Sequence, residues 1–325
     1  YLSGNYYVFS KIIKLLNSWA VLGNWLTAAK ICTGIVFWTA AFLMIICIFA
    51  RGVNIPVPVY RAMFSFGAVW LVFILYMVMA LAVTDIAKLF IPSFKYSFAI
   101  AFAFTCCILV YGWWNYHTPK IKNVNIVFSK GNSEQFKGLR IVGISDMHLG
   151  YGTGKKQLKK YVDLINSLNP HIILIAGDLI DNSVVPLYKE NMQEELCSLK
   201  APLGIYMAPG NHEYISGIEK SCNFLKETPI TLLKDSVITL SNGIQIIGRD
   251  DRHNKKRKSL DELIDRTSAQ SPSILLDHQP YELEKTDSLQ IDLQFSGHTH
   301  RGQIWPVSLL TDFLFEQSYG YRKWE

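Results

Sequence analysis

Three long stretches in the N-terminal third of the chain carry no charged side chain. They cover residues 31–50, 62–83 and 96–114 and are rich in Ile, Leu, Val, Phe and Ala. A helix of about 20 apolar residues is long enough to cross the hydrocarbon core of a bilayer. Three such stretches in close succession predict about three transmembrane helices within residues 31–114, and therefore a multi-pass protein of the cell membrane.

Residues 1–30 show a weaker pattern. Apolar side chains recur there at helical spacing, and Lys11 and Lys14 lie among them. This pattern is typical of a helix in the membrane interface, and equally of the end of a truncated span. Lys and Arg near the spans number five on one side and four on the other, so the side of the membrane that faces the rest of the chain is not predicted.

Beyond residue 137 the pattern changes to short apolar runs that alternate with amphipathic segments. The runs predict strands at 140–145, 171–176, 205–208, 273–276 and 293–295, and the apolar spacing within 157–168 predicts a helix. This alternation predicts an α/β domain over residues 138–325 with a layered, partly parallel sheet. Residues 115–137 are predicted to form a linker and an entry strand.

Each predicted strand is followed by a polar cluster. The clusters read DMH at 146–148, GDLID at 177–181, GNHE at 210–213, DHQ at 277–279 and GHTH at 297–300. Because ligands gather at the carboxyl ends of strands in α/β sheets, the five clusters are predicted to converge. A lone histidine is usually an ordinary polar residue, but five of the eight histidines lie in these clusters: His148, His212, His278, His298 and His300.

The residue types in the clusters indicate metal chemistry. Imidazole and carboxylate groups suit Mn, Fe or Zn, and a carboxylate can bridge two ions. Two ions about 3.5–4 Å apart can hold a phosphoryl group and activate water near neutral pH. The pattern predicts a metal-dependent phosphoesterase with two divalent ions, Mn being preferred and Fe or Zn being the alternatives.

The distribution of charge argues against a nucleic-acid partner. The chain carries a net charge of +6, and all of it belongs to residues 1–114, which hold seven basic side chains and one acidic one. The remaining residues hold 25 basic and 25 acidic side chains. Lys and Arg at the ends of apolar segments are typical of contact with lipid headgroups, whereas a nucleic-acid surface needs a basic catalytic region.

The ordered set DxH, GDxxD, GNHE, a single His after an apolar strand, and GHTH resembles the calcineurin-like metallophosphoesterase superfamily over residues 138–306. With the N-terminal spans, the chain is most similar to the YkuE/YaeI-like membrane-anchored branch, which is related to UDP-2,3-diacylglucosamine hydrolases. The resemblance implies a layered β-sandwich flanked by helices. It also implies a truncated C-terminus, because relatives carry a further glycine-rich segment and strand.

The resemblance also assigns roles. It implies that Asp146, His148 and His300 bind the first metal, that Asp178 bridges, and that Asn211, His278 and His298 bind the second. His212 would then act on the leaving group or on phosphate charge, with Asp178 as the other catalytic residue. Asp181 and Glu213 are expected either to orient imidazoles or to be ordinary acids. Arg301 either touches substrate phosphate or is simply exposed.

The predicted function is therefore hydrolysis of a phosphomonoester, phosphodiester or pyrophosphate bond at a membrane. A lipid-linked substrate such as UDP-2,3-diacylglucosamine fits the spans, and no protein partner is inferred. Two alternatives stay open: a phosphodiesterase for soluble nucleotides, and a non-enzymatic membrane scaffold with a structural metal site. The basic segment 249–258 is expected to be a solvated loop or a patch for anionic headgroups.

Overall fold

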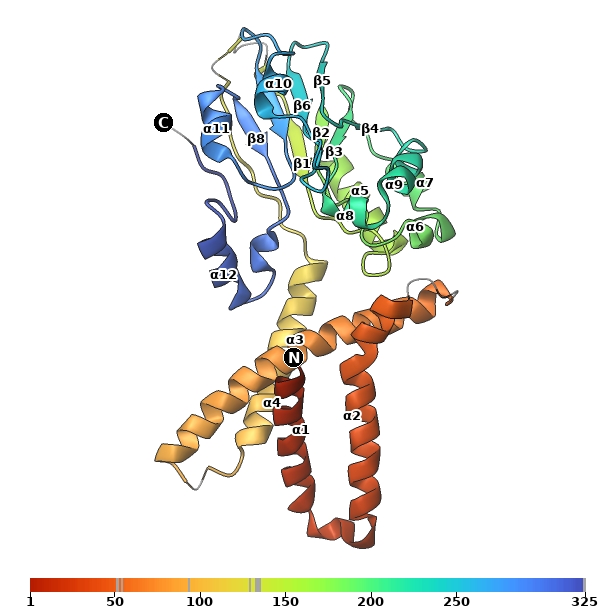
Figure 1. Cartoon of the computed structure of the whole chain (residues 1–325), viewed down its shortest axis with the longest axis vertical. Helices are drawn as coiled ribbons and strands as arrows, with labels where there is room; N and C mark the ends of the chain where they lie inside the picture. Colours follow the sequence, from red (N-terminus) through yellow and green to blue (C-terminus); the bar gives the residue numbers. More distant parts are fainter. Residues whose placement is uncertain (51–52, 54, 93, 129, 132–135, 324–325) are drawn as a thin grey trace. The chain divides into compact units, whose positions relative to one another are not determined.

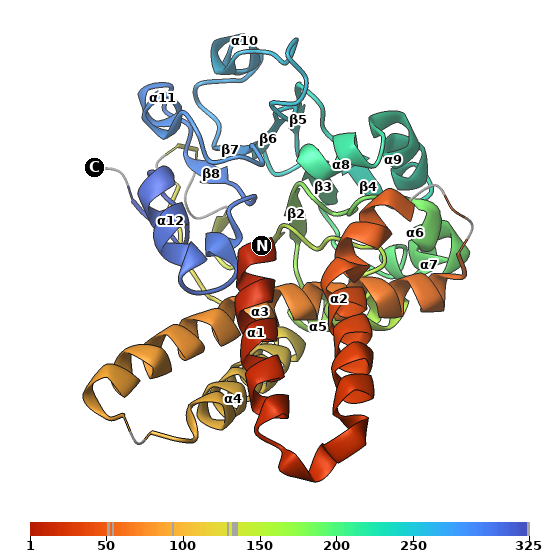
Figure 2. The same cartoon turned by 60° about the horizontal axis from the view of Figure 1, so that its bottom comes forward.

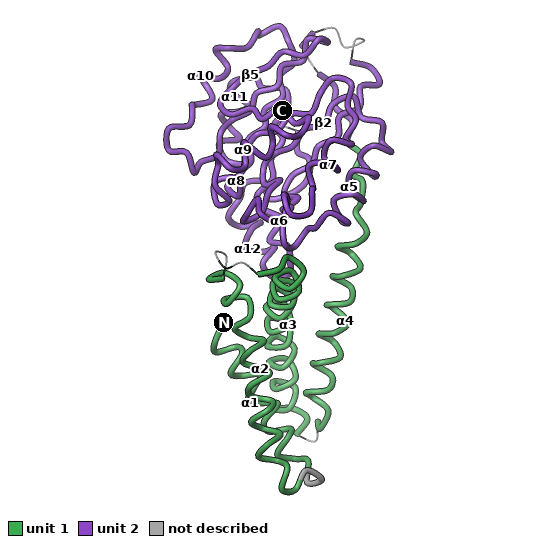
Figure 3. The backbone as a smooth tube through the Cα atoms, turned by 90° about the vertical axis from the view of Figure 1, so that its right-hand side faces the viewer, with its two compact units in different colours: residues 1–123 green, residues 124–325 purple. Residues whose placement is uncertain are grey.

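The computed structural model describes all residues except 51–52, 54, 93, 129, 132–135 and 324–325 (Figure 1). The chain divides into two compact units, residues 1–123 and residues 124–325 (Figure 3). Each unit has its own hydrophobic core, and each is described by itself.

All regular elements in the described part of the first unit are helices. Three of its helices are long and apolar enough to cross a membrane, in segments that run from Gly23 to Phe49, from Val57 to Phe90 and from Ser97 to His117. These segments agree with the three predicted spans. The elements are α1 (Leu2–Asn17), η1 (Ala20–Trp25), α2 (Leu26–Phe49), α3 (Val57–Phe90) and α4 (Ser97–His117).

Helix α1 packs against α2 and α3. Its Asn5 is buried and accepts a hydrogen bond of 3.0 Å from the indole N–H of Trp70 on α3. Further along, Tyr7 donates to Asp85 of α3 at 2.6 Å, and Lys11 forms an ion pair with the same carboxylate. The polar groups of α1 and α3 therefore satisfy one another. The two interpretations of residues 1–30, a helix in the membrane interface and the end of a span, both stay predictions.

The second unit is built on two four-stranded sheets that face each other. The first has the order β1-β2-β3-β4 and is parallel throughout; the second has the order β5-β6-β7-β8, and only the β5–β6 pair is antiparallel. The strands are β1 (Ile141–Ile144), β2 (Ile172–Ala176), β3 (Ile205–Ala208), β4 (Ile230–Leu232), β5 (Ser236–Thr239), β6 (Gln245–Gly248), β7 (Ser273–Leu276) and β8 (Leu293–Phe295).

Side chains of β2 alternate between two cores, as the two-residue period of a strand requires. Ile172 and Leu174 point between the sheets, where they meet Ile246 and Ile274 of the second sheet. Ile173 and Ile175 point to the opposite face, which helices cover. The fold is the predicted layered sandwich flanked by helices.

Helices cover the outer face of each sheet. Figure 2 shows α5–α9 on the side of the first sheet and α10 and α11 on the side of the second. Their bounds are α5 (Lys155–Ser167), α6 (Val185–Lys189), α7 (Met192–Leu196), α8 (Asn211–Ile215), α9 (Ile218–Leu225), α10 (Leu260–Ile264) and α11 (Leu283–Ser288), followed by η4 (His300–Gly302) and α12 (Val307–Leu314).

One predicted element is not found where the structure can be described. Residues 118–128 and 136–137 form no strand, although an entry strand was expected within 115–137; residues 129 and 132–135 of that range lie outside the described part. Residues 119–127 are exposed. None of these described residues pairs with a strand of either sheet.

Candidate metal centre

The carboxyl ends of five strands supply the candidate site. Strands β1, β2 and β3 of the first sheet and β7 and β8 of the second lead directly into the polar clusters. The structure brings His212 together with all seven predicted metal ligands. These ligands are Asp146, His148, Asp178, Asn211, His278, His298 and His300.

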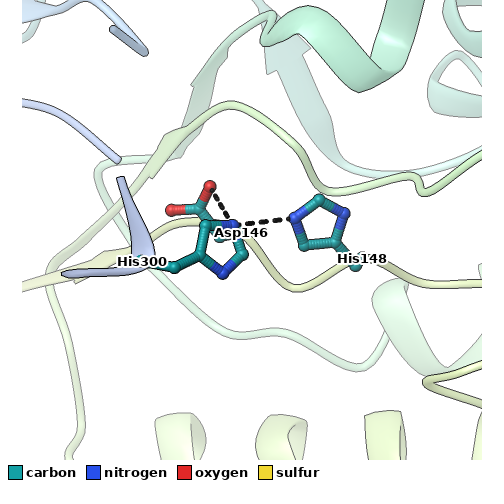
Figure 4. Close-up of side chains that lie close together, drawn as sticks. All are labelled: Asp146, His148 and His300. Atoms are coloured by element: carbon teal, nitrogen blue, oxygen red, sulfur yellow. Dashed lines mark hydrogen bonds and ion pairs between the residues drawn. The ribbon is translucent and has the colours of Figure 1, made fainter. Parts of the chain in front are cut away.

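A first group of ligand atoms lies near the rim of the site. The Nε2 atoms of His148 and His300 are 3.1 Å apart, and Nε2 of His300 is 3.2 Å from Oδ1 of Asp146 (Figure 4). His300 is exposed, while Asp146 and His148 are half-buried. This group is therefore the accessible part of the site.

A second group lies deeper. Nε2 of His278 is 3.1 Å from Oδ2 of Asp178 and 3.1 Å from Oδ1 of Asn211. The same Asn211 oxygen is 2.9 Å from Nδ1 of His298. Asp178 and His278 are buried, while Asn211 and His298 are half-buried, so this group is less accessible to solvent than the first.

Asp178 belongs to both groups. Its Oδ2 lies 3.1 Å from the deep His278 and 3.8 Å from Nε2 of His148 at the rim. Its Oδ1 accepts a hydrogen bond of 2.8 Å from the backbone N–H of His212. The carboxylate is thus placed where a bridge between two neighbouring ions would lie.

These distances fit a pair of metal ions. Ligand atoms that bind one ion at about 2.1 Å lie roughly 3–3.4 Å from one another, and the neighbouring ligand atoms given above are 2.9–3.2 Å apart. Lone pairs of imidazole nitrogens and carboxylate oxygens converge in each group, and such a donor set suits Mn, Fe or Zn. The residues present therefore fit a binuclear centre.

The backbone of the site is held in an uncommon conformation. Asp146, His148, Asp178, His298 and His300 all have positive φ, between 46° and 71°. Residues other than glycine rarely adopt this conformation, and it is concentrated at functional sites because it costs free energy. Five cases in one cluster indicate that the turns are shaped to aim these side chains inward.

Glycines allow the turns to approach one another. A Cβ atom on Gly297 would lie 2.3 Å from Oδ2 of Asp146, and one on Gly210 would lie 2.2 Å from Oδ1 of Asp178. No real side chain tolerates such a distance. The carboxylates of Asp146 and Asp178 therefore require glycine at positions 297 and 210.

Second partners fix the orientation of two imidazoles. The Nδ1–H of His278 donates to the carbonyl oxygen of Ala176 at 2.7 Å, which leaves Nε2 directed at Asp178. Nδ1 of His148 lies 3.4 Å from Oδ1 of Asp181. Partners of this kind set the tautomer and the angle of a metal-binding imidazole.

His212 stands beside the first group. Its Nδ1 lies 3.1 Å from Oδ1 of Asp181, and its ring is perpendicular to that of His148 at 4.4 Å. Burial alone would lower the pKa of His212, but the contact with Asp181 and the charges of Asp178 and Asp181 raise it above its usual value. Asp181 thus faces both His148 and His212.

The structure shows the surroundings of Glu213, for which the sequence left two roles open. The side chain is fully buried and accepts backbone N–H groups from Asp178, Gly210 and Ile180 at 3.0, 2.7 and 3.0 Å. Burial, together with the charge of Asp178, raises its pKa to about 7. Glu213 ties the loops after β2 and β3 together.

Strong electrostatic coupling runs through the centre. Burial alone would raise the pKa of Asp146, yet the hydrogen bond from His300 and the charges of His278 and His300 hold it below its usual range. Burial alone would lower the pKa of His278, but its interactions with Asp178 raise it to about 9. The cluster therefore favours ionised carboxylates next to imidazoles.

Two arginines of the basic segment 249–258 differ from its prediction, whereas Arg252, Lys255 and Lys256 are exposed in a loop, as a solvated loop requires. Arg249 is 5% exposed, and its Nη1 donates to Asp277 at 3.1 Å; Arg257 lies 3.4 Å from the same carboxylate. These two arginines therefore form neither a solvated loop nor a surface for headgroups. They surround the buried acid next to His278, a role that sequence composition does not reveal.

Arg301 is exposed and does not point at the ligand atoms through any described contact. Its guanidinium lies over the ring of Tyr319 at 5.3 Å, and its Nε is 3.9 Å from Asp312. Phe315 is a neighbour of the site that the sequence did not reveal. Its ring lies 6.1 Å from that of His298 and 5.3 Å from that of Tyr281.

The chain is similar to known phosphoesterases. The sequence model for the calcineurin-like phosphoesterases matches residues 139–302. An uncharacterized metallophosphoesterase of Helicobacter pylori is 33% identical over 68% of this chain and 60% of its own. The transmembrane protein with metallophosphoesterase domain of Danio rerio is 33% identical over 65% of this chain and 51% of its own.

UDP-2,3-diacylglucosamine pyrophosphatase LpxG of Chlamydia trachomatis is more distant, at 28% identity over 61% of this chain and 76% of its own. The chain spans only half to three fifths of the length of the Helicobacter and Danio relatives. The similarity to a transmembrane protein agrees with the three long apolar helices, which make the chain a multi-pass membrane protein.

Proposed function

The chain belongs to the calcineurin-like phosphoesterase family, and from this premise we propose that it hydrolyses a phosphate ester or pyrophosphate bond at a membrane, with two divalent metal ions. The observation that carries the proposal is the pair of ligand groups that share Asp178. A metal site that only stabilised the fold would not need the open rim around His300. Enzymatic hydrolysis is therefore favoured over a scaffold.

The ligand assignment follows the two groups. Asp146, His148 and His300 would hold the rim ion, and Asn211, His278 and His298 the deep ion, with Asp178 between them. Mn is the preferred metal, because the set mixes oxygen and nitrogen atoms, and Fe and Zn suit it as well. When bound, two such ions neutralise phosphate charge and supply activated water.

Residues of the chain itself would carry the other steps. His212 lies at the rim beside His148, where its imidazole can give a proton to the departing oxygen or stabilise phosphate charge. Asp181 would fix the orientation of the His212 and His148 rings through its Oδ1, which faces Nδ1 of both rings. Glu213 would act only as a positioning residue, through the backbone that it binds.

A lipid-linked substrate is the finer part of the proposal. Three candidate spans precede the catalytic unit, and tethering of this kind confines a site to the vicinity of lipid headgroups. The similarity to a protein named UDP-2,3-diacylglucosamine pyrophosphatase supports a nucleotide-linked lipid as the first substrate to test. Soluble nucleotides are the competing substrate class.

The test of the proposed activity compares four purified chains in detergent with Mn²⁺ and bis-p-nitrophenyl phosphate. Wild type should hydrolyse the ester, whereas Asp178→Ala and His212→Ala should lose about 10²-fold or more of kcat. His253→Ala is the matched control, because His253 is half-exposed on a loop outside the ligand groups. Retention of wild-type activity by Asp178→Ala would refute the proposal.

The substrate class is tested separately with the active wild-type chain. UDP-2,3-diacylglucosamine in mixed micelles and a series of soluble nucleotides are supplied at equal concentration, and released phosphate or nucleotide is measured. A higher kcat/KM for the lipid supports the finer proposal. Hydrolysis of the soluble nucleotides alone would overturn it and leave the phosphoesterase assignment in place.

A further inference from the structure

Helix α12 is an amphipathic helix whose orientation is inverted with respect to an ordinary surface helix. A surface helix normally directs its apolar side at the protein core. No residue of α12 is buried. Its apolar side chains are all exposed, Phe313 to 85% and Leu309 to 59%, and the others are Val307, Leu310 and Leu314.

The polar side of α12 is the side that contacts the protein. Asp312 accepts a hydrogen bond from the hydroxyl of Ser318, and Nε of Arg301 lies 3.9 Å from it. A Cβ atom on Gly302 would lie 2.6 Å from the backbone nitrogen of Ser308. At 3.6 residues per turn, Ser308, Thr311 and Asp312 fall on one side of the helix and the five apolar residues on the other.

The surroundings of the exposed apolar face are typical of a membrane interface. Trp305, Tyr319 and Tyr321 are exposed on the flanking segments, and tryptophan and tyrosine are enriched at the level of lipid headgroups. Three basic side chains are also exposed there, namely Arg301, Arg322 and Lys323, compared with two acidic ones, Asp312 and Glu316. Cations beside an apolar helix face suit anionic lipids.

A bilayer is the apolar phase that this chain keeps within reach. Helix α4 ends at His117 and β1 begins at Ile141, so the connecting chain holds the catalytic unit within about 80 Å of a membrane span at full extension. We propose that α12 docks on the lipid bilayer, with Leu309, Leu310 and Phe313 inserted at the boundary between headgroups and acyl chains.

Docking of α12 would place the metal centre at the headgroup plane. The helix follows the ligand His300 after six residues, and the hydroxyl of Thr299 donates to the carbonyl of Ser318 at 2.6 Å. Phe315, directly after α12, lies against the ring of His298. In Figure 1, α12 lies beyond the carboxyl end of β8, away from both sheets. The docking surface and the ligand loop are thus one continuous structure.

The test uses the full chain in vesicles of phosphatidylcholine and phosphatidylglycerol. The six native cysteines are replaced by Ala, and a polarity-sensitive fluorophore is attached at Phe313→Cys or, as the matched control, at Lys159→Cys on the exposed polar face of α5. Lipids with brominated acyl chains quench only probes that reach the boundary between headgroups and acyl chains. The emission of the probe at 313 should shift to the blue in ordinary vesicles, and most of it should be lost in vesicles with brominated lipids. The control probe should show neither change.

A second pair of variants excludes quenching through mere tethering. Leu309→Glu with Leu310→Glu, in the chain labelled at 313, should restore the emission to the level of the control. Leu309→Phe with Leu310→Phe keeps the apolar face and should keep the quenching. Absence of quenching at 313, whether another protein segment or a second copy covers α12, would overturn the proposal, and so would quenching that survives the two glutamates. Neither outcome touches the hydrolysis assay above.

Discussion

Two residues that are not among the predicted metal ligands, Gly297 and Glu213, shape the loops that carry those ligands. Gly297 leaves room for the carboxylate of Asp146, whose oxygens accept the backbone N–H of His298 at 2.9 and 3.1 Å. Glu213 gathers three N–H groups from two loops. At the residue scale, ligand geometry depends on close approach of the backbone.

Replacement of Gly297 by Ala should weaken metal binding. The new Cβ would stand 2.3 Å from Oδ2 of Asp146, so the carboxylate or the 297–300 loop must move. We expect metal affinity to fall by about 10- to 100-fold, as for a lost orienting contact, measured by metal titration followed by mass spectrometry. Gly112→Ala, where a Cβ meets nothing within 4 Å, is the control. Unchanged affinity in Gly297→Ala would contradict the account.

Replacement of Glu213 by Gln should destabilise the catalytic unit. An amide offers one acceptor oxygen where the carboxylate offers two, and its NH₂ group would face backbone donors. Leaving buried donors unsatisfied costs about 1–3 kcal/mol, so the free energy of unfolding should fall by that amount in denaturant titrations. Glu219→Gln, at an exposed acid of α9, serves as the control. A wild-type transition in Glu213→Gln would show that the three hydrogen bonds contribute little.

At the scale of elements, three of the strands that carry ligands, β2, β3 and β7, were predictable because they are buried on both faces. Such strands read as continuous apolar runs, and β2 is buried at every position. Strands β4, β5 and β6 were not predicted. β4 and β5 are short and partly exposed, whereas β6 is buried at every position. The sequence also left the role of Arg249 open. Only the parallel pairing of β6 with β7 places it beside Asp277.

Close contact of α2 with α3 depends on one glycine. A Cβ on Gly67 of α3 would lie 2.7 Å from the backbone nitrogen of Met44 on α2, and small residues allow such approach between membrane helices. Gly67→Ala should therefore force the helices apart and cost about 1–3 kcal/mol. On heating in detergent, the Gly67→Ala chain should aggregate at a lower temperature than the wild type, whereas Gly112→Ala should aggregate at the wild-type temperature. The same aggregation temperature for both variants would argue that the helices do not meet there.

At the scale of the whole molecule, composition alone separated a membrane region from a catalytic region. All of the net charge belongs to the first 114 residues, and the structure divides the chain near that point, into residues 1–123 and 124–325. The identity of the substrate could not be predicted in the same way, because motif residues specify the metal centre and not the surfaces around it. Helix α12 is such a surface, and its significance depends on orientation, which only the fold supplies.

The central claim, two metal ions joined by Asp178, is tested most directly by electron paramagnetic resonance of the Mn²⁺-loaded chain with metal counting. Two ions about 3.5–4 Å apart are magnetically coupled. We expect two Mn²⁺ per chain and the spectrum of a coupled pair in the wild type, and loss of that coupling in Asp178→Ala with His253→Ala unchanged. A single uncoupled ion in the wild type, or a coupled pair that survives in Asp178→Ala, would contradict the account.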